Sequence, residues 1–286
     1  MRVKEIVPDN ALLNSLQPLD RHASTKDARF MAFEYIAVEE AIERRGLRMV
    51  VAGNLPSPWS EAAKGIFHIK RIEWAAVRLV YDSEALKTWA GQRSAPVVVN
   101  DDEAPRTGWA EILMLAEHLA PEPPLLPAAP KERARVVALG DKFCGERGLG
   151  WMRRLQAVHA GLQKSGGFPE RVAAYLGKKY GYDAAAADTY TGRVRELLGA
   201  VSAELRVQHD AGMPYYLGNT LSAADVYSAT FMALFKPLPQ EVCRMDPATR
   251  AAFEGLDPET EAALDPVLLA HRDMMYSRHL ELPLSL

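Results

Sequence analysis

Hydrophobic positions between residues 47 and 121 alternate between short apolar runs and stretches with helical spacing. The apolar runs predict strands at 48–52, 74–80 and 96–99, and a brief edge strand near 104–106. The helical spacing predicts helices at 59–68, 83–89 and 109–119. The order βαβαββα predicts parallel first strands with right-handed crossovers and a final antiparallel hairpin.

A proline-rich segment ends this alternation. Residues 121–130 contain five prolines in ten positions, which cannot continue a helix or a central strand, so we interpret the segment as a stiff linker. Beyond it, helical spacing predominates at 131–145, 151–164, 169–181, 188–209, 222–235, from 247 onward and at 258–278. We therefore predict an α/β domain at 47–121, followed by an all-helical bundle at 122–286.

Residues 1–46 are predicted to form a helical extension. Ser24 with Asp27 has the spacing of a helix-capping pair, and Tyr35, Val38 and Ile42 recur at helical spacing before Gly46. Such an amphipathic helix is expected to pack on the domain that follows.

Composition excludes several classes of protein. The 286 residues carry 34 Lys and Arg against 37 Asp and Glu, and 48% of them are apolar, which is ordinary globular usage. A charge of −3 lacks the basic footprint of a nucleic-acid binder. No apolar run reaches the ~18 residues of a membrane span. The N-terminus has no apolar stretch of a secretory signal, so we expect a cytoplasmic protein.

The cysteines and histidines suggest neither a disulfide framework nor a metal site. Cys144 and Cys243 are far apart in the sequence, and we expect them to be reduced residues of the core. The seven histidines form no ligand motif, so no metal is expected.

The segment from Asn54 to Ser60, which includes Ser57, Pro58 and Trp59, joins a predicted strand to a predicted helix. Ser57 suits the N-cap and Pro58 the first helical position. Unpaired amides and partial positive charge at such a helix end stabilise a thiolate or another anion. Alternatively, Ser57 only caps the helix.

Two further segments could contribute to a site. Pro96 enters a predicted buried strand, and a cis Ala95–Pro96 bond would free the backbone of Ala95 to face a ligand. Glu111 lies near the start of a helix, where it either stabilises that helix or pairs with a ligand ammonium group.

Two other motifs are interpreted as structural. Ser222 and Asp225 form a capping box, and Leu221 with Val226 forms a hydrophobic staple. The basic pair Arg153–Arg154 is expected on a solvated helix face.

Taken together and in order, these segments resemble the cytosolic glutathione S-transferase superfamily, over about residues 47–235. Ser57-Pro58-Trp59-Ser60 is similar to that family's Cys-Pro-x-Cys or serine-containing segment, and Ala95-Pro96 to its Val-Pro pair. Glu111-Ile112 is similar to its Glu-Ser pair, and the segment 216–225 to its capping segment in the helical domain. The resemblance implies a thioredoxin-like N-terminal domain followed by a helical C-terminal domain.

The resemblance also implies a function and a set of roles. Glutathione would be the co-substrate, Ser57 would donate a hydrogen bond to its sulfur, and Glu111 would hold the γ-glutamyl ammonium group. The backbone of Ala95, beside a cis Pro96, would bind the cysteinyl part. Ile112 stands where the family has a serine that contacts the γ-glutamyl carboxylate, so one donor is missing.

The chemistry beyond the thiol stays open at this point. The thiolate would attack a small electrophile in a cleft between the domains, with Trp59, Phe143, Trp151 and Tyr215 as candidate lining residues. A glutathione-dependent isomerase, dehalogenase or ether-cleaving enzyme would use the same thiol site. A binding or scaffold protein without turnover is the other alternative. The resemblance further implies a homodimer.

Overall fold

A mixed four-stranded sheet with the order β1-β3-β2-β4 is present in the computed structural model, which describes residues 34–286. The strands are β1 (Tyr35–Ile36), β2 (Leu47–Val51), β3 (Ala75–Arg78) and β4 (Val97–Asn100). β2 pairs in parallel with β3 and antiparallel with β4. Val98 also bridges Arg106 in antiparallel fashion, so the predicted strand pairing and the brief edge segment are confirmed.

The predicted helical extension is only partly confirmed where the structure describes it: its last part is a helix that packs on β3, but the residues before that helix form a strand. Tyr35 and Ile36 form a strand that pairs in parallel with Ala76 and Val77 of β3, and only α2 (Val38–Glu43) is helical. Backbone pairing to the open edge of β3 overrides the helical spacing, because two apolar residues fit either periodicity. Residues 35–43 thus belong to the sheet domain. The predicted cap at Ser24 and Asp27 lies outside the described residues.

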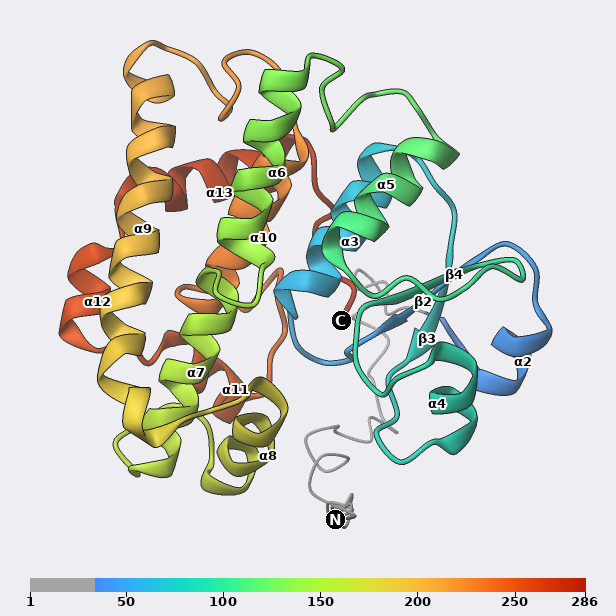
Figure 1. The fold of residues 1–286 in the computed structure, drawn as a ribbon, viewed down its shortest axis with the longest axis horizontal. Coiled ribbons are helices and arrows are strands. Elements are labelled where there is room, and N and C mark those ends of the chain that lie inside the picture. The colour runs from blue at the N-terminus through green and yellow to red at the C-terminus, as the bar shows by residue number, and fades with distance from the viewer. Residues whose placement is uncertain (1–33) are drawn as a thin grey trace.

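Helices cover both faces of the sheet. α3 (Pro58–Ile69) and α5 (Trp109–Leu119) pack together on the face towards the rest of the molecule. α2 and α4 (Glu84–Ala90) lie on the other face (Figure 1). Sheet and helices from residue 35 to residue 119 form what we call the sheet domain.

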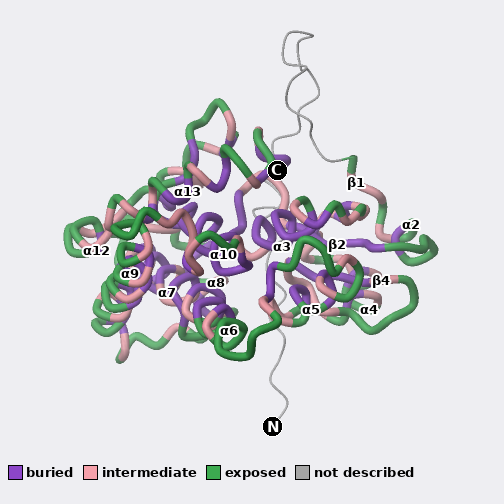
Figure 2. The backbone as a smooth tube through the Cα atoms, turned by 90° about the horizontal axis from the view of Figure 1, so that it is seen from above, coloured by how far each residue is buried: buried purple, intermediate pink, exposed green. Residues whose placement is uncertain are grey.

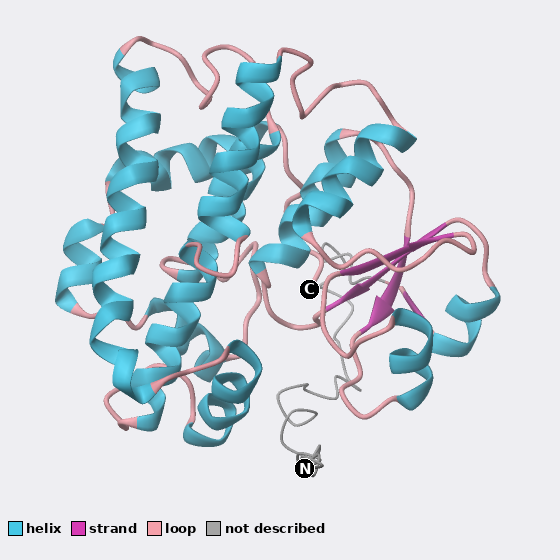
Figure 3. Cartoon of the chain, viewed as in Figure 1, coloured by secondary structure: helices cyan, strands magenta, loops and turns pink. Residues whose placement is uncertain are grey.

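The remaining chain, from residue 130 onward, is helical, and we call it the helical domain (Figure 3). Its helices are α6 (Pro130–Cys144), α7 (Leu149–Leu162), α8 (Glu170–Tyr180), α9 (Ala187–Asp210), α10 (Ala223–Phe231), α11 (Pro247–Glu254), α12 (Pro258–Ala263) and α13 (Pro266–Arg278), with short 3₁₀ turns at Ala184–Ala186 and Met232–Leu234. The predicted last helix is divided because Asp265 caps a new helix that begins at Pro266.

The two domains share one core. α10 packs against α3, and purple buried backbone runs through both helices (Figure 2). The proline-rich linker is fixed to the end of α3, where the Lys70 ammonium group donates to the carbonyls of Ala120 at 2.7 Å and Pro123 at 2.9 Å. The start of the linker is therefore held at the end of α3, the same helix on which α10 of the helical domain packs.

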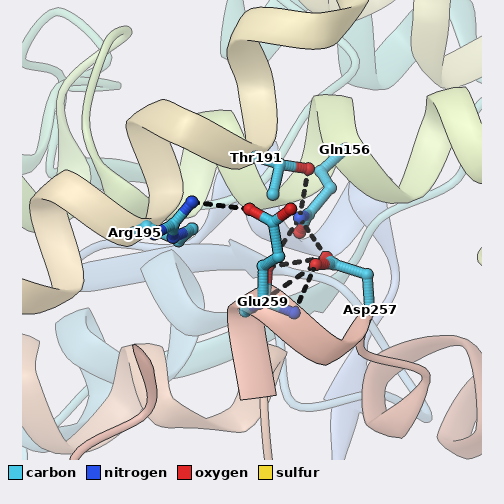
Figure 4. A network of polar contacts seen from close by, with 6 residues as sticks. Gln156, Thr191, Arg195, Asp257 and Glu259 are labelled. Atoms are coloured by element: carbon cyan, nitrogen blue, oxygen red, sulfur yellow. Dashed lines mark hydrogen bonds and ion pairs between the residues drawn. The ribbon is translucent and has the colours of Figure 1, made fainter. Parts of the chain in front are cut away.

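A polar network fixes the C-terminal helices. The Gln156 amide nitrogen on α7 lies within hydrogen-bond distance of Thr191 on α9 at 3.0 Å, of Asp257 at 2.6 Å and of Thr260 at 2.8 Å (Figure 4). Arg195 on α9 pairs with Glu259 at 2.5 Å beside it. These bonds attach the start of α12 to the α7–α9 pair.

Candidate functional site

Ser57 lies at the junction between the loop after β2 and the first turn of α3. Its backbone is extended, Pro58 occupies the first helical position, and the amide of Ser57 donates to the carbonyl of Leu55 at 2.9 Å. The hydroxyl forms no capping hydrogen bond with the helix. The interpretation that Ser57 merely caps α3 through its side chain is therefore not supported, and its hydroxyl is available for another partner.

The Ala95–Pro96 peptide bond is cis, as predicted. Pro96 is buried and Ala95 is half-buried at the entry to β4. Within residues 34–286, the Ala95 backbone has no hydrogen-bond partner. Its polar groups are consequently free to meet a ligand.

A cavity of about 120 Å³ lies between the two domains and contains both Ser57 and Ala95 in its wall. We call it the interdomain cavity. The sheet domain contributes Ala52, Leu55, Ser57, Leu79, Tyr81 and Ala95, and the helical domain contributes Arg154, Phe168, Pro169, Val172, Tyr175, Leu176, Lys179, Tyr180, Ala248, Thr249, Ala252 and Phe253. One wall thus comes from the predicted thiol site, and the other from α7, α8 and α11.

Trp59 connects this cavity to the helical domain. Its indole N–H donates to the carbonyl of Cys144 at 3.0 Å, and its ring meets Phe231 edge-on with centroids 5.0 Å apart. Gly150 permits this approach, because a Cβ there would lie only 2.9 Å from the Trp59 ring. On its other side, the ring stacks under the guanidinium of Arg154, 5.1 Å from the ring centre.

Pro96 and Ile112 do not line the interdomain cavity. They contribute, with Trp59, to a separate hollow of about 20 Å³ in the domain interface, which has room for about one water molecule. Ile112 is 2% exposed and belongs to the large hydrophobic core. Its side chain therefore serves packing between the domains.

Glu111 lies outside both the interdomain cavity and the smaller hollow. It is exposed on the first turn of α5, and one carboxylate oxygen accepts the amides of Gly108 at 2.9 Å and Thr107 at 3.2 Å. These two amide hydrogen bonds hold the pKa of the Glu111 carboxyl below its usual value. The helix-stabilising role of Glu111 is thus confirmed, and Glu111 is not among the residues that line the interdomain cavity. Its pairing with a ligand ammonium group stays a prediction.

Ser60 is also not among the residues that line the cavity. It is 1% exposed, and its hydroxyl has no hydrogen-bond partner among the described residues. Of the predicted site residues, only Ser57 and Ala95 meet at one cavity, with Pro58 and Trp59 positioning that end of α3.

The charge in the interdomain cavity is positive. Arg154 and Lys179 are its cationic residues, and no Asp or Glu is among its described lining residues. Burial, reinforced by nearby tyrosines, raises the pKa of Tyr81 to about 12. Burial likewise raises the pKa of Tyr175. Both tyrosines are therefore neutral hydroxyls at physiological pH.

The expected aromatic lining was wrong. Trp59, Phe143, Trp151 and Tyr215 are not among the lining residues. The aromatic residues that line the cavity are Tyr81, Phe168, Tyr175, Tyr180 and Phe253. The sequence contained a signal for α8: Val172, Tyr175, Leu176 and Lys179 recur at helical spacing and share one face. Without the fold, nothing indicated that this face meets the loop after β2.

The expected solvated face for Arg153–Arg154 was also wrong. Arg153 is 3% exposed and donates to the carbonyls of Leu234 at 3.1 Å and Gly255 at 2.8 Å. Burial lowers the pKa of Arg153 to about 10, so it stays protonated at neutral pH. Arg154 is half-buried at the cavity.

The structural roles predicted for the two cysteines and for the capping box are confirmed. Cys144 and Cys243 are both buried free thiols. Burial raises the pKa of each thiol, so neither is a thiolate at neutral pH. The Asp225 carboxylate accepts the Ser222 amide at 2.9 Å, as the capping box requires, and also contacts His271 at 3.2 Å.

No group of three or more His, Cys, Asp or Glu side chains in residues 34–286 is arranged to hold a metal ion. In the same part of the chain, no helix combines the length and the apolar character needed to cross a bilayer.

The architecture defines the class of fold: a thioredoxin-like sheet domain, with a cis-proline before its antiparallel strand, joined to an all-helical domain. No family model and no curated protein sequence matches the chain. A glutathione S-transferase from Methylobacillus flagellatus, solved with glutathione bound, superposes with a TM-score of 0.57 at 15% identity, covering 82% of this chain and 96% of its own.

A second solved structure agrees with the first. It is a glutathione S-transferase from Methylobacterium radiotolerans in complex with glutathione sulfonate, with a TM-score of 0.52 at 19% identity, covering 81% of this chain and 91% of its own. The chain therefore has the fold of the glutathione S-transferase superfamily.

Proposed function

We propose that this protein binds glutathione in the interdomain cavity and activates its thiol for attack on a small electrophile. The observation that carries the proposal is the shared position of Ser57 and Ala95 on one wall of that cavity. The Ser57 hydroxyl, free of any capping bond, donates to the glutathione sulfur. The backbone of Ala95 pairs with the cysteinyl backbone.

Electrostatics favour the anionic form of the thiol. A free thiol has a pKa of about 8.5, so only a few per cent is ionised at neutral pH. A sulfur beside Ser57 would meet the positive end of α3, the hydroxyl donor, and a wall whose charged groups are both cations. Ser57 acts as an orienting donor and not as the nucleophile.

The electrophile would occupy the part of the cavity formed by the helical domain. Alkyl or aryl transfer, isomerisation, dehalogenation and ether cleavage all begin from the same thiolate, so the residues on α8 and α11 decide among them. The two solved proteins with glutathione or its sulfonate bound support glutathione as the thiol.

A second candidate function is a binding or scaffold protein that has this fold and no turnover. Two observations favour it. One oxygen of the Glu111 carboxylate already accepts the amides of Thr107 and Gly108, and Ile112 offers no donor and is buried. Glutathione would then lack the contacts that the family resemblance implies for its γ-glutamyl end.

Glutathione titration by calorimetry, followed by turnover of an activated aryl halide, separates the two candidates. We expect millimolar or tighter binding and measurable conjugation in the wild type, with conjugation lowered about 10-fold or more in Ser57→Ala. Ser277→Ala, an exposed serine on α13, is the matched control and should leave both unchanged. No binding at millimolar glutathione supports the scaffold, and equal turnover in Ser57→Ala removes Ser57 from the mechanism.

A further inference from the structure

The helical wall of the interdomain cavity carries a guanidinium group whose hydrogen-bonding capacity is only partly used. Arg154 projects from α7, and its Nη1 donates to the Tyr180 hydroxyl at 2.7 Å. Its Nε is buried and has no hydrogen-bond partner within the described part of the chain. A buried N–H without an acceptor is costly, so this group is one that a ligand can satisfy.

Two aromatic rings flank the guanidinium. It lies 5.1 Å from the centre of the Trp59 ring and 5.0 Å from that of Tyr180, so an aromatic side chain packs near it from each domain. A planar guanidinium presents paired N–H donors along its edges, and the edge with Nε is the one that Tyr180 leaves free. That edge matches the two oxygens of a carboxylate.

The charges around Arg154 are unbalanced. No carboxylate forms an ion pair with Arg154 or Lys179 among residues 34–286, and no acid is among the described lining residues. Most of the other lining residues are apolar, with Leu55, Val172 and Phe253 among them. A ligand with an apolar body and one anionic group would complement both features.

We propose that Arg154 is a specificity-determining residue that selects an apolar carboxylate as the second ligand of the interdomain cavity. The inference deepens the proposed function, since it names the chemical class of the electrophile that would meet the thiolate. The carboxylate would pair with the Nε edge of Arg154, and Lys179 would add to the attraction from the last turn of α8.

The same group could instead hold a carboxylate of glutathione itself, and the experiment distinguishes the two sources. Phenylbutyrate and its primary amide, phenylbutyramide, have nearly the same shape and differ in charge. Their binding to the full chain is measured by calorimetry without glutathione. We expect the carboxylate to bind at least about 10-fold more tightly than the amide, because a charged hydrogen bond contributes about that factor.

Variants then show whether Arg154 is responsible for the preference for the carboxylate over the amide. Arg154→Met should reduce the difference in affinity between the carboxylate and the amide to within about twofold. Lys178→Met is the control, because it removes one positive charge from the same helix as Lys179 but outside the cavity wall, and it should preserve that difference. Glutathione affinity is measured separately in Arg154→Met, which shows whether the guanidinium also holds glutathione. Thermal unfolding of each variant checks that it is folded.

Three results would overturn the inference. The first is equal binding of carboxylate and amide in the wild type, a measurement that needs no variant. The second is an equal loss in Arg154→Met and Lys178→Met, which would indicate general attraction by surface charge. The third is a large loss of glutathione affinity in Arg154→Met with the carboxylate preference intact. If glutathione does not bind while the preference is found, the proposed function fails and this inference stands.

Discussion

The Arg154 guanidinium on α7 stacks on the Trp59 ring of α3, 5.1 Å from its centre, so a cation of the helical domain contacts the residue two positions after Ser57. This contact joins the predicted thiol site to the wall that would receive a second ligand. Any movement between the domains would therefore change the cavity and the surroundings of Ser57 together.

A double-mutant cycle measures that contact. We expect Trp59→Leu and Arg154→Met, separately and combined, to show a coupling energy of about 0.5–2 kcal/mol in urea unfolding, the range for a partly desolvated cation–π pair. Trp59→Leu also loses the indole bond to Cys144, so its single effect will be the larger one. Strict additivity of the two single effects would show that the stacking contributes nothing to stability.

A buried ion pair on α3 gives a pH-dependent prediction. The Lys64 ammonium group contacts both carboxylate oxygens of Glu61, at 2.7 and 2.9 Å, and the carbonyl of Ser285 at 2.7 Å. Lys64→Met would leave the Glu61 charge buried without its partner and should cost about 3–5 kcal/mol. Glu61→Met combined with Lys64→Met should recover most of that loss.

The sign of the pH dependence follows from Glu61. Burial raises the pKa of Glu61, although attraction to Lys64 opposes the rise, so removal of Lys64 raises it further. In folded Lys64→Met, Glu61 keeps a proton that it loses in the unfolded chain above about pH 4.3. The stability of the variant therefore falls as the pH rises from that value through the raised pKa of folded Glu61. The deficit of Lys64→Met should be larger at about pH 8 than at about pH 5. A deficit independent of pH would contradict this account.

Glu111 is predicted to matter for stability and not for glutathione. Because amide hydrogen bonds lower its folded pKa, its contribution is present at neutral pH and is lost as the pH falls through that lowered value. Glu111→Ala should cost about 0.5–1 kcal/mol at neutral pH. Glutathione affinity, measured by calorimetry, should change by less than about twofold. A large loss of affinity at unchanged stability would instead assign the carboxylate to the ligand.

Ile112 tests whether the missing serine limits glutathione binding. We expect Ile112→Ser to destabilise the protein by about 2–5 kcal/mol, because it removes a side chain that is 2% exposed and buries a hydroxyl. Met114→Ser, on the same helix but 50% exposed, is the matched control and should cost only about 0.5 kcal/mol. A marked gain in glutathione affinity in Ile112→Ser would place this residue at the binding site after all.

The fold was predictable because its signals are local. Apolar runs, helical spacing and caps such as Asp225 placed the elements of both domains close to their observed bounds. β1 was missed because two apolar residues carry no periodicity of their own, and only the open edge of β3 makes them a strand. The homodimer and the cytoplasmic location stay predictions.

The site was less predictable because it is assembled from distant segments. Ser57 and the cis bond before Pro96 follow from their own short motifs. Arg154 lies some 97 positions after Ser57 in the sequence, and its exposure depends on how α7 meets α3. The family resemblance placed Glu111 at the site, whereas in the structure one of its carboxylate oxygens accepts the amides of Thr107 and Gly108, and the residue does not line the interdomain cavity.

The ionisation of bound glutathione tests the central claim most directly. The ultraviolet absorbance of the thiolate, followed against pH with the protein in excess, gives the pKa of the bound thiol. We predict a value at least about one unit below the ~8.5 of a free thiol in the wild type, shifted back towards it in Ser57→Ala. A bound thiol with an unshifted pKa, or the same lowered pKa in both proteins, would contradict the role assigned to Ser57.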